Sequence, residues 1–266
     1  MPWPRLMEQA LVTVAAGLAT TGKLPFVATY GVFLSMRTLE QLRTQICLPG
    51  LGVKFAAGLG GLSGGVLGPT HQATEDLSVV RGIPNLTVLV PSDAVAMRAA
   101  VRAAVDWPGS LYLRVGGACP AVHREGYTFT VGKAEKVLRL GDDTTIIANG
   151  IMVAKALAAA EVLQGEGIRV RVLEMPTLKP LDETAVLAAA RATGGVVTAE
   201  ENNVLGGLGG AVAEVLGEGC PVPLRRVGIR DCYGDTGPYP ALQERYGLTS
   251  EAIIDAVREV AGRKRK

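Results

Sequence analysis

The amino-acid sequence predicts an α/β protein with two doubly wound domains and mostly parallel sheets. Along nearly the whole chain, short apolar runs typical of strands alternate with longer helical patterns. The strand-like runs are continuously apolar, as in parallel strands covered on both faces. Parallel strands also need a crossover between them, usually a helix, and the alternation supplies one. With 266 residues, 48% of them hydrophobic and 20% charged, the chain is globular and long enough for a sizeable core.

In the first half, the helical patterns and apolar runs can be assigned in order. One helix carries Asp93 at a position typical of an N-cap, where a short acidic side chain accepts a backbone hydrogen bond. The predicted helices are 11–19, 33–46 and 93–105, and the predicted strands are 25–29, 53–57, 86–90 and 110–115.

The second half repeats the alternation. Residues 116–132 lose all periodicity, so we place a linker at 119–132, between a first domain at 1–118 and a second at 133–266. Ser250 is positioned to cap the last helix. The predicted strands are 144–150, 168–175, 196–201 and 223–229, and the predicted helices are 151–167, 183–195, 205–217 and 250–262.

The first half opens directly in a helix, with no strand before it. An open α/β sheet normally begins with a strand. We therefore expect the first domain to lack its first βα unit, either because the start codon is misplaced or because the missing piece is supplied otherwise.

Composition argues against several classes of function. The formal charge of +2 is too small to indicate a nucleic-acid partner, and the basic cluster at 262–266 is a short chain end that we expect to fray. Apolar runs are broken by charge before they reach membrane-spanning length, and residues 1–6 show no signal-peptide pattern. The four cysteines lie far apart without CxxC spacing, which favours reduced thiols in a cytoplasm over a zinc site or disulfides.

Taken singly, the candidate functional residues all have structural explanations. Glu8 in the first turn of a helix is favourable by about 0.3–1 kcal/mol because of the helix dipole. Tyr30 and Phe33 have the spacing of core aromatics, and His71 could be a surface histidine near a helix N-terminus. The glycine-rich run at 205–210 lacks the lysine of a phosphate-binding loop.

Taken together, these residues resemble the C-terminal half of transketolases, which contains a pyrimidine-binding domain and a small C-terminal domain. A glutamate heads a helix, an aromatic pair ends the next strand, and "GPTHQ" at 68–72 precedes a further helix. The resemblance covers nearly the whole chain, in the order of the family. Its other segments are "PNLTVLVPSDA", "GKAEKVLRLGDDTTIIANG", "VRVLEMPTLKPLD" and "VTAEENNVLGGLGGAVAEVL".

The resemblance implies a thiamine diphosphate enzyme and assigns roles to matching residues. Glu8 matches the glutamate that hydrogen-bonds the aminopyrimidine ring and promotes proton exchange there. Tyr30 and Phe33 match the aromatic pair around that ring, with Phe33 as the stacking platform. His71 matches a histidine that binds the sugar substrate. Arg114 matches an arginine that grips its phosphate through a bidentate fork.

The sequence also departs from the family pattern. Transketolases commonly carry Glu-Asp directly before "GxTH", where this chain has Val66 and Leu67. Met36 stands where tyrosine is frequent, and no second histidine occurs near Ala56. The glycine-rich segment at 58–68 is about three residues longer than usual. Leu67 would make one wall of the sugar pocket apolar. We therefore expect these departures to affect the choice of substrate, and even activity.

These features favour the smaller subunit of a split transketolase, which moves a two-carbon ketol unit between phosphorylated sugars. The diphosphate and a divalent metal such as Mg²⁺ would be held by an N-terminal partner subunit, in a complex built on a homodimer or as α2β2. Two alternatives remain: another thiamine diphosphate enzyme, similar to deoxyxylulose phosphate synthase or to the β subunit of a 2-oxoacid dehydrogenase, and a non-catalytic structural subunit.

Overall fold

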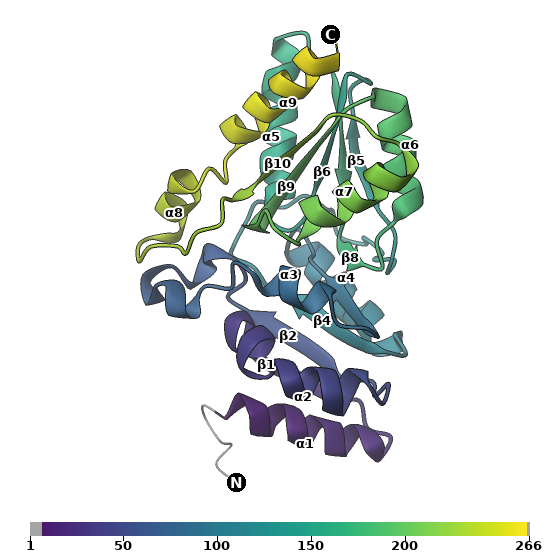
Figure 1. Ribbon diagram of the computed structural model, residues 1–266, viewed down its shortest axis with the longest axis vertical. Helices are drawn as coiled ribbons and strands as arrows, with labels where there is room; N and C mark the ends of the chain where they lie inside the picture. The colour runs from purple at the N-terminus through teal and green to yellow at the C-terminus, as the bar shows by residue number, and fades with distance from the viewer. Residues whose placement is uncertain (1–6, 265–266) are drawn as a thin grey trace.

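Two mainly parallel five-stranded sheets lie one above the other in the computed structural model, which describes residues 7–264 (Figure 1). The sheet of the lower half has the order β1-β2-β4-β3-β8, and the sheet of the upper half has the order β10-β9-β6-β7-β5. The predicted α/β class with two doubly wound sheets is therefore confirmed.

The lower sheet is built from four parallel strands of the first half of the chain. They are β1 (Phe26–Tyr30), β2 (Lys54–Gly58), β3 (Leu86–Leu89) and β4 (Ser110–Arg114). The helix predicted at 33–46 is interrupted, because two π-helical segments flank a single short α-helix. The helices are α1 (Glu8–Thr20), η1 (Phe33–Arg37), α2 (Leu39–Gln41), η2 (Leu42–Cys47), η3 (Leu62–Leu67), η4 (Pro69–His71), α3 (Asp76–Arg81) and α4 (Ala94–Asp106).

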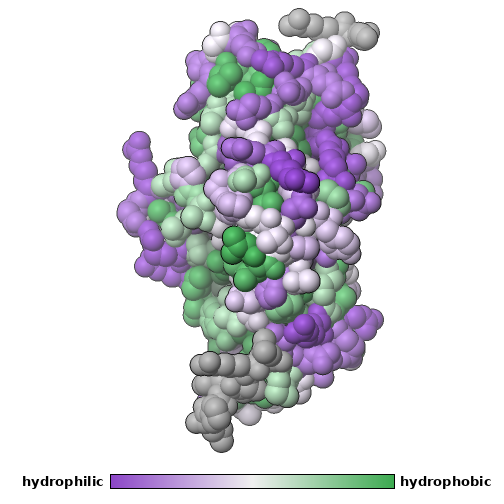
Figure 2. All heavy atoms as spheres, turned by 90° about the vertical axis from the view of Figure 1, so that its left-hand side faces the viewer, coloured by the Kyte–Doolittle hydropathy of each residue, from purple (hydrophilic) through white to green (hydrophobic). Residues whose placement is uncertain are grey.

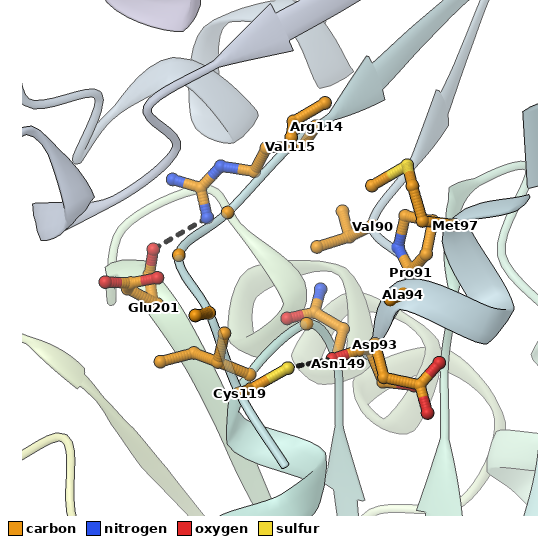
Figure 3. Close-up of a pocket in the computed structure, with 16 residues that line it drawn as sticks. Val90, Pro91, Asp93, Ala94, Met97, Arg114, Val115, Cys119, Asn149 and Glu201 are labelled. Atoms are coloured by element: carbon orange, nitrogen blue, oxygen red, sulfur yellow. Dashed lines mark hydrogen bonds between the residues drawn. The ribbon is translucent and has the colours of Figure 1, made fainter. Parts of the chain in front are cut away.

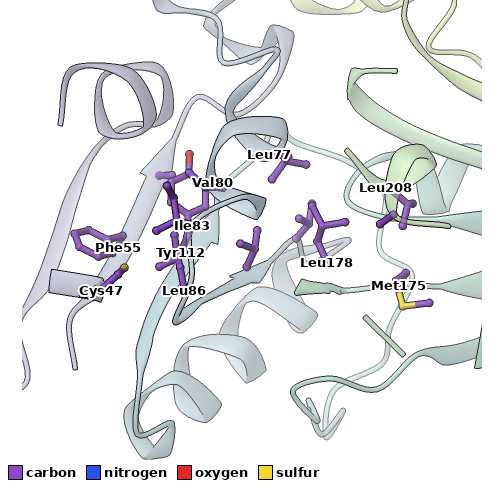
Figure 4. Close-up of a cluster of buried hydrophobic side chains, with 14 of the residues drawn as sticks. Cys47, Phe55, Leu77, Val80, Ile83, Leu86, Tyr112, Met175, Leu178 and Leu208 are labelled. Atoms are coloured by element: carbon purple, nitrogen blue, oxygen red, sulfur yellow. The ribbon is translucent and has the colours of Figure 1, made fainter. Parts of the chain in front are cut away.

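A fifth strand of the lower sheet comes from the second half of the chain. Strand β8 (Thr177–Lys179) has only three residues and pairs antiparallel with β3, so the lower sheet contains residues of both predicted domains. One cluster of the hydrophobic core also contains residues of both halves. Figure 4 shows Phe55 and Tyr112 of the lower sheet in one cluster with Met175, Leu178 and Leu208.

The upper sheet has helices on both faces. One face is covered by α5 (Met152–Gly165) and α9 (Ser250–Lys264), and the other by α6 (Glu183–Thr193) and α7 (Leu208–Gly219), with α8 (Tyr239–Arg245) beside the lower edge (Figure 1). An antiparallel edge strand, β5, was not predicted. The strands are β5 (Glu135–Arg139), β6 (Thr144–Ala148), β7 (Val170–Glu174), β9 (Val196–Asn203) and β10 (Leu224–Ile229).

Of the two predicted N-caps, the one of α4 is confirmed and the one of α9 is wrong. Asp93 caps α4, since its Oδ1 accepts a hydrogen bond from the Ala96 amide at 2.7 Å. Ser250 was predicted to cap α9, but it is the first residue of that helix. The preceding Thr249 accepts the hydrogen bond of the Ala252 amide instead, at 3.2 Å.

The glycine-rich run at 205–210 forms a turn and the first residues of α7, and a carboxylate of the same chain binds to this helix end. Both oxygens of Glu200 accept hydrogen bonds at 2.7 Å from the first amides of α7, those of Leu208 and Gly209. A Cβ on Gly207 would lie 2.1 Å from the Glu200 Oε2 atom. Burial raises the pKa of Glu200 to about 7, although both backbone hydrogen bonds lower it. The glycines therefore allow Glu200, rather than a phosphate, to approach this helix end.

Residues 116–132 contain no helix or strand, but hydrogen bonds connect them to both halves of the chain. Asp93 Oδ2 accepts from the amides of Val122 and His123, and His123 Nε2 lies 2.6 Å from Glu174 Oε2 in β7. The division into domains at 119–132 stays a prediction.

Two of the sequence predictions concern residues that lie outside the described part of the chain. The absence of a signal peptide at 1–6 is one of them. The other is the fraying of 262–266, of which only 262–264 are described, as the end of α9. Within residues 7–264, no helix is long and apolar enough to cross a membrane.

Candidate functional site

Glu8 is a buried carboxylate that is hydrogen-bonded by Arg37, a residue that is not among the candidates of the sequence analysis. It is the first residue of α1 and only 5% exposed. Its Oε2 accepts a hydrogen bond from Arg37 Nη1 at 2.8 Å. Burial raises the pKa of Glu8. The hydrogen bond and charge of Arg37, together with a backbone hydrogen bond, lower this pKa by more than burial raises it. The net pKa lies below its ordinary value, so Glu8 is ionised at neutral pH.

Three rings meet where β1 ends. Tyr30 is the last residue of β1 and Phe33 opens η1, and their ring centroids are 5.9 Å apart. The imidazole of His71 packs edge-on against both, 5.7 Å from Tyr30 and 5.2 Å from Phe33. The guanidinium of Arg37 lies 4.3 Å from the Phe33 ring centroid. The fold therefore brings four of the predicted residues to one place, with Arg37 linking Glu8 to the rings.

The segment that carries His71 is braced by the second half of the chain. The His71 Nδ1 atom lies 3.0 Å from the hydroxyl of Thr70. The next residue, Gln72, donates to the carbonyl of Asp235 at 2.8 Å, and the amide of Leu62 donates to Glu201 Oε1 at 3.1 Å. The position of His71 therefore depends on contacts between the two halves.

Val66 and Leu67 form an exposed apolar pair at the end of η3. Their exposed fractions are 71% and 49%, and Met36 is also exposed. Figure 2 views the side of the molecule on which η3, η4 and α8 lie, and apolar surface gathers at mid-height on that face. Whether Leu67 contacts substrate stays a prediction.

Arg114 does not join His71, because its guanidinium is buried in an internal network. It is 3% exposed and donates four hydrogen bonds. Two go to the carboxylate of Asp76, at 2.7 and 3.0 Å, and the others go to the carbonyls of Ala73 and Glu201. A guanidinium has only five N–H donors. This geometry does not match the predicted grip on a sugar phosphate; it joins β4, α3 and β9.

One sequence signal could have identified Arg37. It follows Phe33 by four residues, so both side chains lie on one face of a helix in this strand-to-helix turn. The roles of Asp76 and Glu201 carried no such signal, because their shared partner Arg114 lies far from both in sequence.

Comparison with known proteins adds an independent finding. The family model described as "Transketolase, pyrimidine binding domain" matches residues 5–116, and the one described as "Transketolase, C-terminal domain" matches residues 132–253. The chain is 48% identical over 259 residues to the 6-deoxy-6-sulfo-D-fructose transketolase subunit SqwH of Clostridium sp. (strain MSTE9), covering 97% of this chain and 80% of that protein.

The chain belongs to the transketolase family.

Two further relatives of the transketolase family are similar over most of their length. One of the subunits of the apulose-4-phosphate transketolase of Phocaeicola vulgatus is 39% identical, with 96% of this chain and 81% of that protein covered. A solved structure described as a split gene transketolase, inactive beta4 tetramer, is 45% identical with a TM-score of 0.91, covering 97% of this chain and 82% of the other. Like these relatives, the chain has the domain composition of a split-transketolase C-terminal subunit.

The pyrimidine-binding domain of this family implies thiamine diphosphate as the cofactor. An aminopyrimidine needs a flat apolar face and a carboxylate at its edge. The Phe33 ring and the buried Glu8 supply these two groups, and Arg37 contacts both of them. The residues therefore fit the ring. Among residues 7–264 there is no group of three His, Cys, Asp or Glu side chains that could hold a metal.

Proposed function

We propose that this chain is the pyrimidine-binding subunit of a two-chain transketolase that transfers a two-carbon ketol unit between phosphorylated sugars. The observation that carries the proposal is the cluster at the end of β1, where Arg37 connects ionised Glu8 to the Phe33 ring and His71 packs against that ring. When bound, thiamine diphosphate supplies the nucleophilic carbon that accepts the ketol unit.

Each residue of this cluster has a proposed task. Glu8 accepts a hydrogen bond from the pyrimidine edge and exchanges a proton with it, for which a carboxylate is suited. Phe33 and Tyr30 hold the ring in place and exclude water from its faces. His71 hydrogen-bonds the sugar and is oriented for this by the two aromatic rings.

A partner subunit completes the proposed site. It would hold the diphosphate and a divalent metal such as Mg²⁺, as the resemblance to the C-terminal half of transketolases implies. We expect an α2β2 heterotetramer or a complex built on a homodimer of this chain. A cytoplasmic location in sugar-phosphate metabolism is part of the proposal and is supported by the four free cysteines.

The anionic group of the substrate could be a sulfonate instead of a phosphate. The relative with 48% identity is named for a sulfonated sugar, and another relative is named for a sugar phosphate. A sulfonate and a phosphate are both tetrahedral oxyanions, so one pocket can accept either class. We therefore include 6-deoxy-6-sulfofructose among the candidate donors.

The test begins with co-purification of this chain and a candidate N-terminal transketolase subunit from the same organism. The reconstituted complex is given xylulose 5-phosphate, 6-deoxy-6-sulfofructose or pyruvate as donor, and the products are identified. We expect ketol transfer from a sugar donor by the complex, and weak cofactor binding without turnover by the isolated chain. Deoxyxylulose phosphate formed from pyruvate, or decarboxylation of a 2-oxoacid, would establish the alternative enzymes. A complex without turnover on any donor would establish a structural subunit.

The role of Glu8 is tested in the same complex. Glu8→Gln should lower turnover by at least about 100-fold, the scale of one lost acid–base group, without changing the fold. The matched control is Glu40→Gln, since Glu40 is a glutamate of α2 in the same half of the chain, outside the cluster at the end of β1. Equal turnover of both variants would show that Glu8 has no catalytic role and only stabilises the N-terminus of α1.

A further inference from the structure

A cavity of about 340 Å³ lies between the two sheets and is lined by none of Glu8, Phe33 and His71. Its walls come from the segments that follow β3, β4 and β6 and from the end of β9, as Figure 3 shows for Val90, Val115, Asn149 and Glu201. The carboxyl ends of parallel strands are where open α/β sheets bind their ligands. The volume falls within the range of small-molecule sites and is more than ten times the roughly 30 Å³ that one water occupies.

Two polar side chains of this cavity lack partners among the described residues. Asn149 is 1% exposed, and neither its Oδ1 nor its Nδ2 atom makes a hydrogen bond within the chain. Ser92 is 2% exposed, and its Oγ atom is also without a partner. Buried side-chain polar atoms are nearly always hydrogen-bonded in native proteins. These three atoms therefore need hydrogen-bond partners from outside the chain.

The charged residues of the cavity are already engaged and offer nothing to an anion. The guanidinium of Arg114 is neutralised by Asp76, and the carboxylate of Asp93 accepts three backbone hydrogen bonds. Glu201 accepts from the Leu62 amide, and burial raises its pKa to about 7. With two acidic groups and one paired cation, the cavity disfavours a sugar phosphate or sulfonate.

The remaining walls are largely apolar. Val90 and Met97 line the cavity (Figure 3), and so does Ile151, so the body of an occupant would be covered by hydrocarbon. The amide of Asn149 presents one donor and one acceptor side by side, and their complement is another amide edge. We infer that this cavity binds a small uncharged molecule that carries a cyclic amide or carboxamide edge, paired with Asn149 and assisted by the Ser92 hydroxyl. This inference does not depend on the proposed function.

The experiment uses the full chain with ¹³C-labelled methionine methyl groups. The signal of Met97 reports on the cavity, and that of Met36, an exposed residue of η1 that does not line the cavity, serves as the internal control. The probe is 2-pyridone, a cyclic amide. Two comparison probes are N-methyl-2-pyridone, which has lost the donor, and inorganic phosphate. We expect a saturable shift of the Met97 signal with 2-pyridone, at least about 10-fold weaker binding of the N-methyl analogue, and no shift with phosphate.

Two variants complete the test. In Asn149→Leu, which has similar volume, binding of 2-pyridone should fall at least about 10-fold, and in Ser92→Ala by a smaller factor. Thermal unfolding shows that each variant is folded, and Ser92→Ala provides the comparison if Asn149→Leu is not. The inference is overturned by the absence of a saturable Met97 shift, by equal affinity for the N-methyl analogue, or by unchanged binding in both variants. Saturable binding of phosphate would overturn the argument from charge.

Discussion

At the scale of single residues, the central feature of the candidate site is the ion pair of Arg37 and Glu8, because Arg37 also contacts an aromatic ring. Arg37 bonds to the carboxylate of Glu8 and lies over the ring of Phe33. It therefore contacts the same two groups that are proposed to bind the aminopyrimidine. Because its side chain is about half exposed, Arg37 can tune the charge of Glu8 and still move when another molecule binds.

Replacement of Arg37 by methionine should raise the pKa of Glu8. The buried carboxylate would lose its main compensating partner, and burial alone disfavours the charged form. In the native chain the pKa of Glu8 is lowered, so its contribution to stability is present above the ordinary pKa of glutamate and is lost as pH falls through the folded value. A carboxyl-carbon NMR titration of both proteins measures the difference. An unchanged pKa of Glu8 in Arg37→Met would show that the pair is not maintained in solution.

Leu67 is the residue at which substrate choice should respond. An apolar wall cannot hydrogen-bond a sugar hydroxyl and so discriminates poorly, whereas a carboxylate there would discriminate strongly. We expect the native complex to accept 2R- and 2S-hydroxyaldehydes and 2-deoxy acceptors at similar rates, and Leu67→Asp to favour one epimer by at least about 10-fold. Val66→Asp, at the even more exposed neighbouring position, is the control. Strong native preference for the 2R acceptor, unaltered in Leu67→Asp, would place Leu67 away from the sugar.

At the scale of elements, the segment between the two predicted domains is tied down rather than loose. Its His123 donates a backbone hydrogen bond to Asp93 at the start of α4, and its imidazole bonds to Glu174 in β7. The Tyr127 ring stacks on this imidazole, with the centroids 3.9 Å apart. One segment without regular structure therefore joins a helix of the first half to a strand of the second.

The stability of the chain should depend on pH through His123. The hydrogen bond with Glu174 raises the pKa of His123, although burial lowers it. Stability from a raised histidine pKa is present below the unfolded value, about 6.5, and is lost as pH rises through the folded value. His123→Gln should therefore lower the free energy of unfolding by about 1–3 kcal/mol at pH 6 and by less at pH 9. Urea unfolding at both pH values measures this, and an equal loss at both would indicate a packing effect only.

At the scale of the whole molecule, the two halves share one core and one buried charge network. Strand β8 adds a piece of the second half to the lower sheet, and Arg114 reaches from β4 to α3 and to the Glu201 carbonyl in β9. Both features connect parts that the sequence assigns to different domains. We therefore expect the chain to unfold in one cooperative transition.

Replacement of Arg114 by methionine tests that connection. It should lower the free energy of unfolding by about 3–5 kcal/mol, because Asp76 would remain as a buried charge without its partner. Removing both charges, in Arg114→Met with Asp76→Leu, should recover much of this loss. Denaturant unfolding measures both variants. Native stability of Arg114→Met together with a raised KM for the sugar phosphate would instead support the phosphate-binding role.

The sequence by itself determined the alternation of strands and helices, the cap at Asp93, and the family to which Glu8, Phe33 and His71 point. These features are local, because periodicity, caps and short motifs depend on neighbours within a few residues. Only the tertiary structure decided the strand order, the place of β8 and the partners of Arg114. A three-residue strand is too short to show a period, and a buried guanidinium takes its acceptors from whichever chain segments packing brings near it.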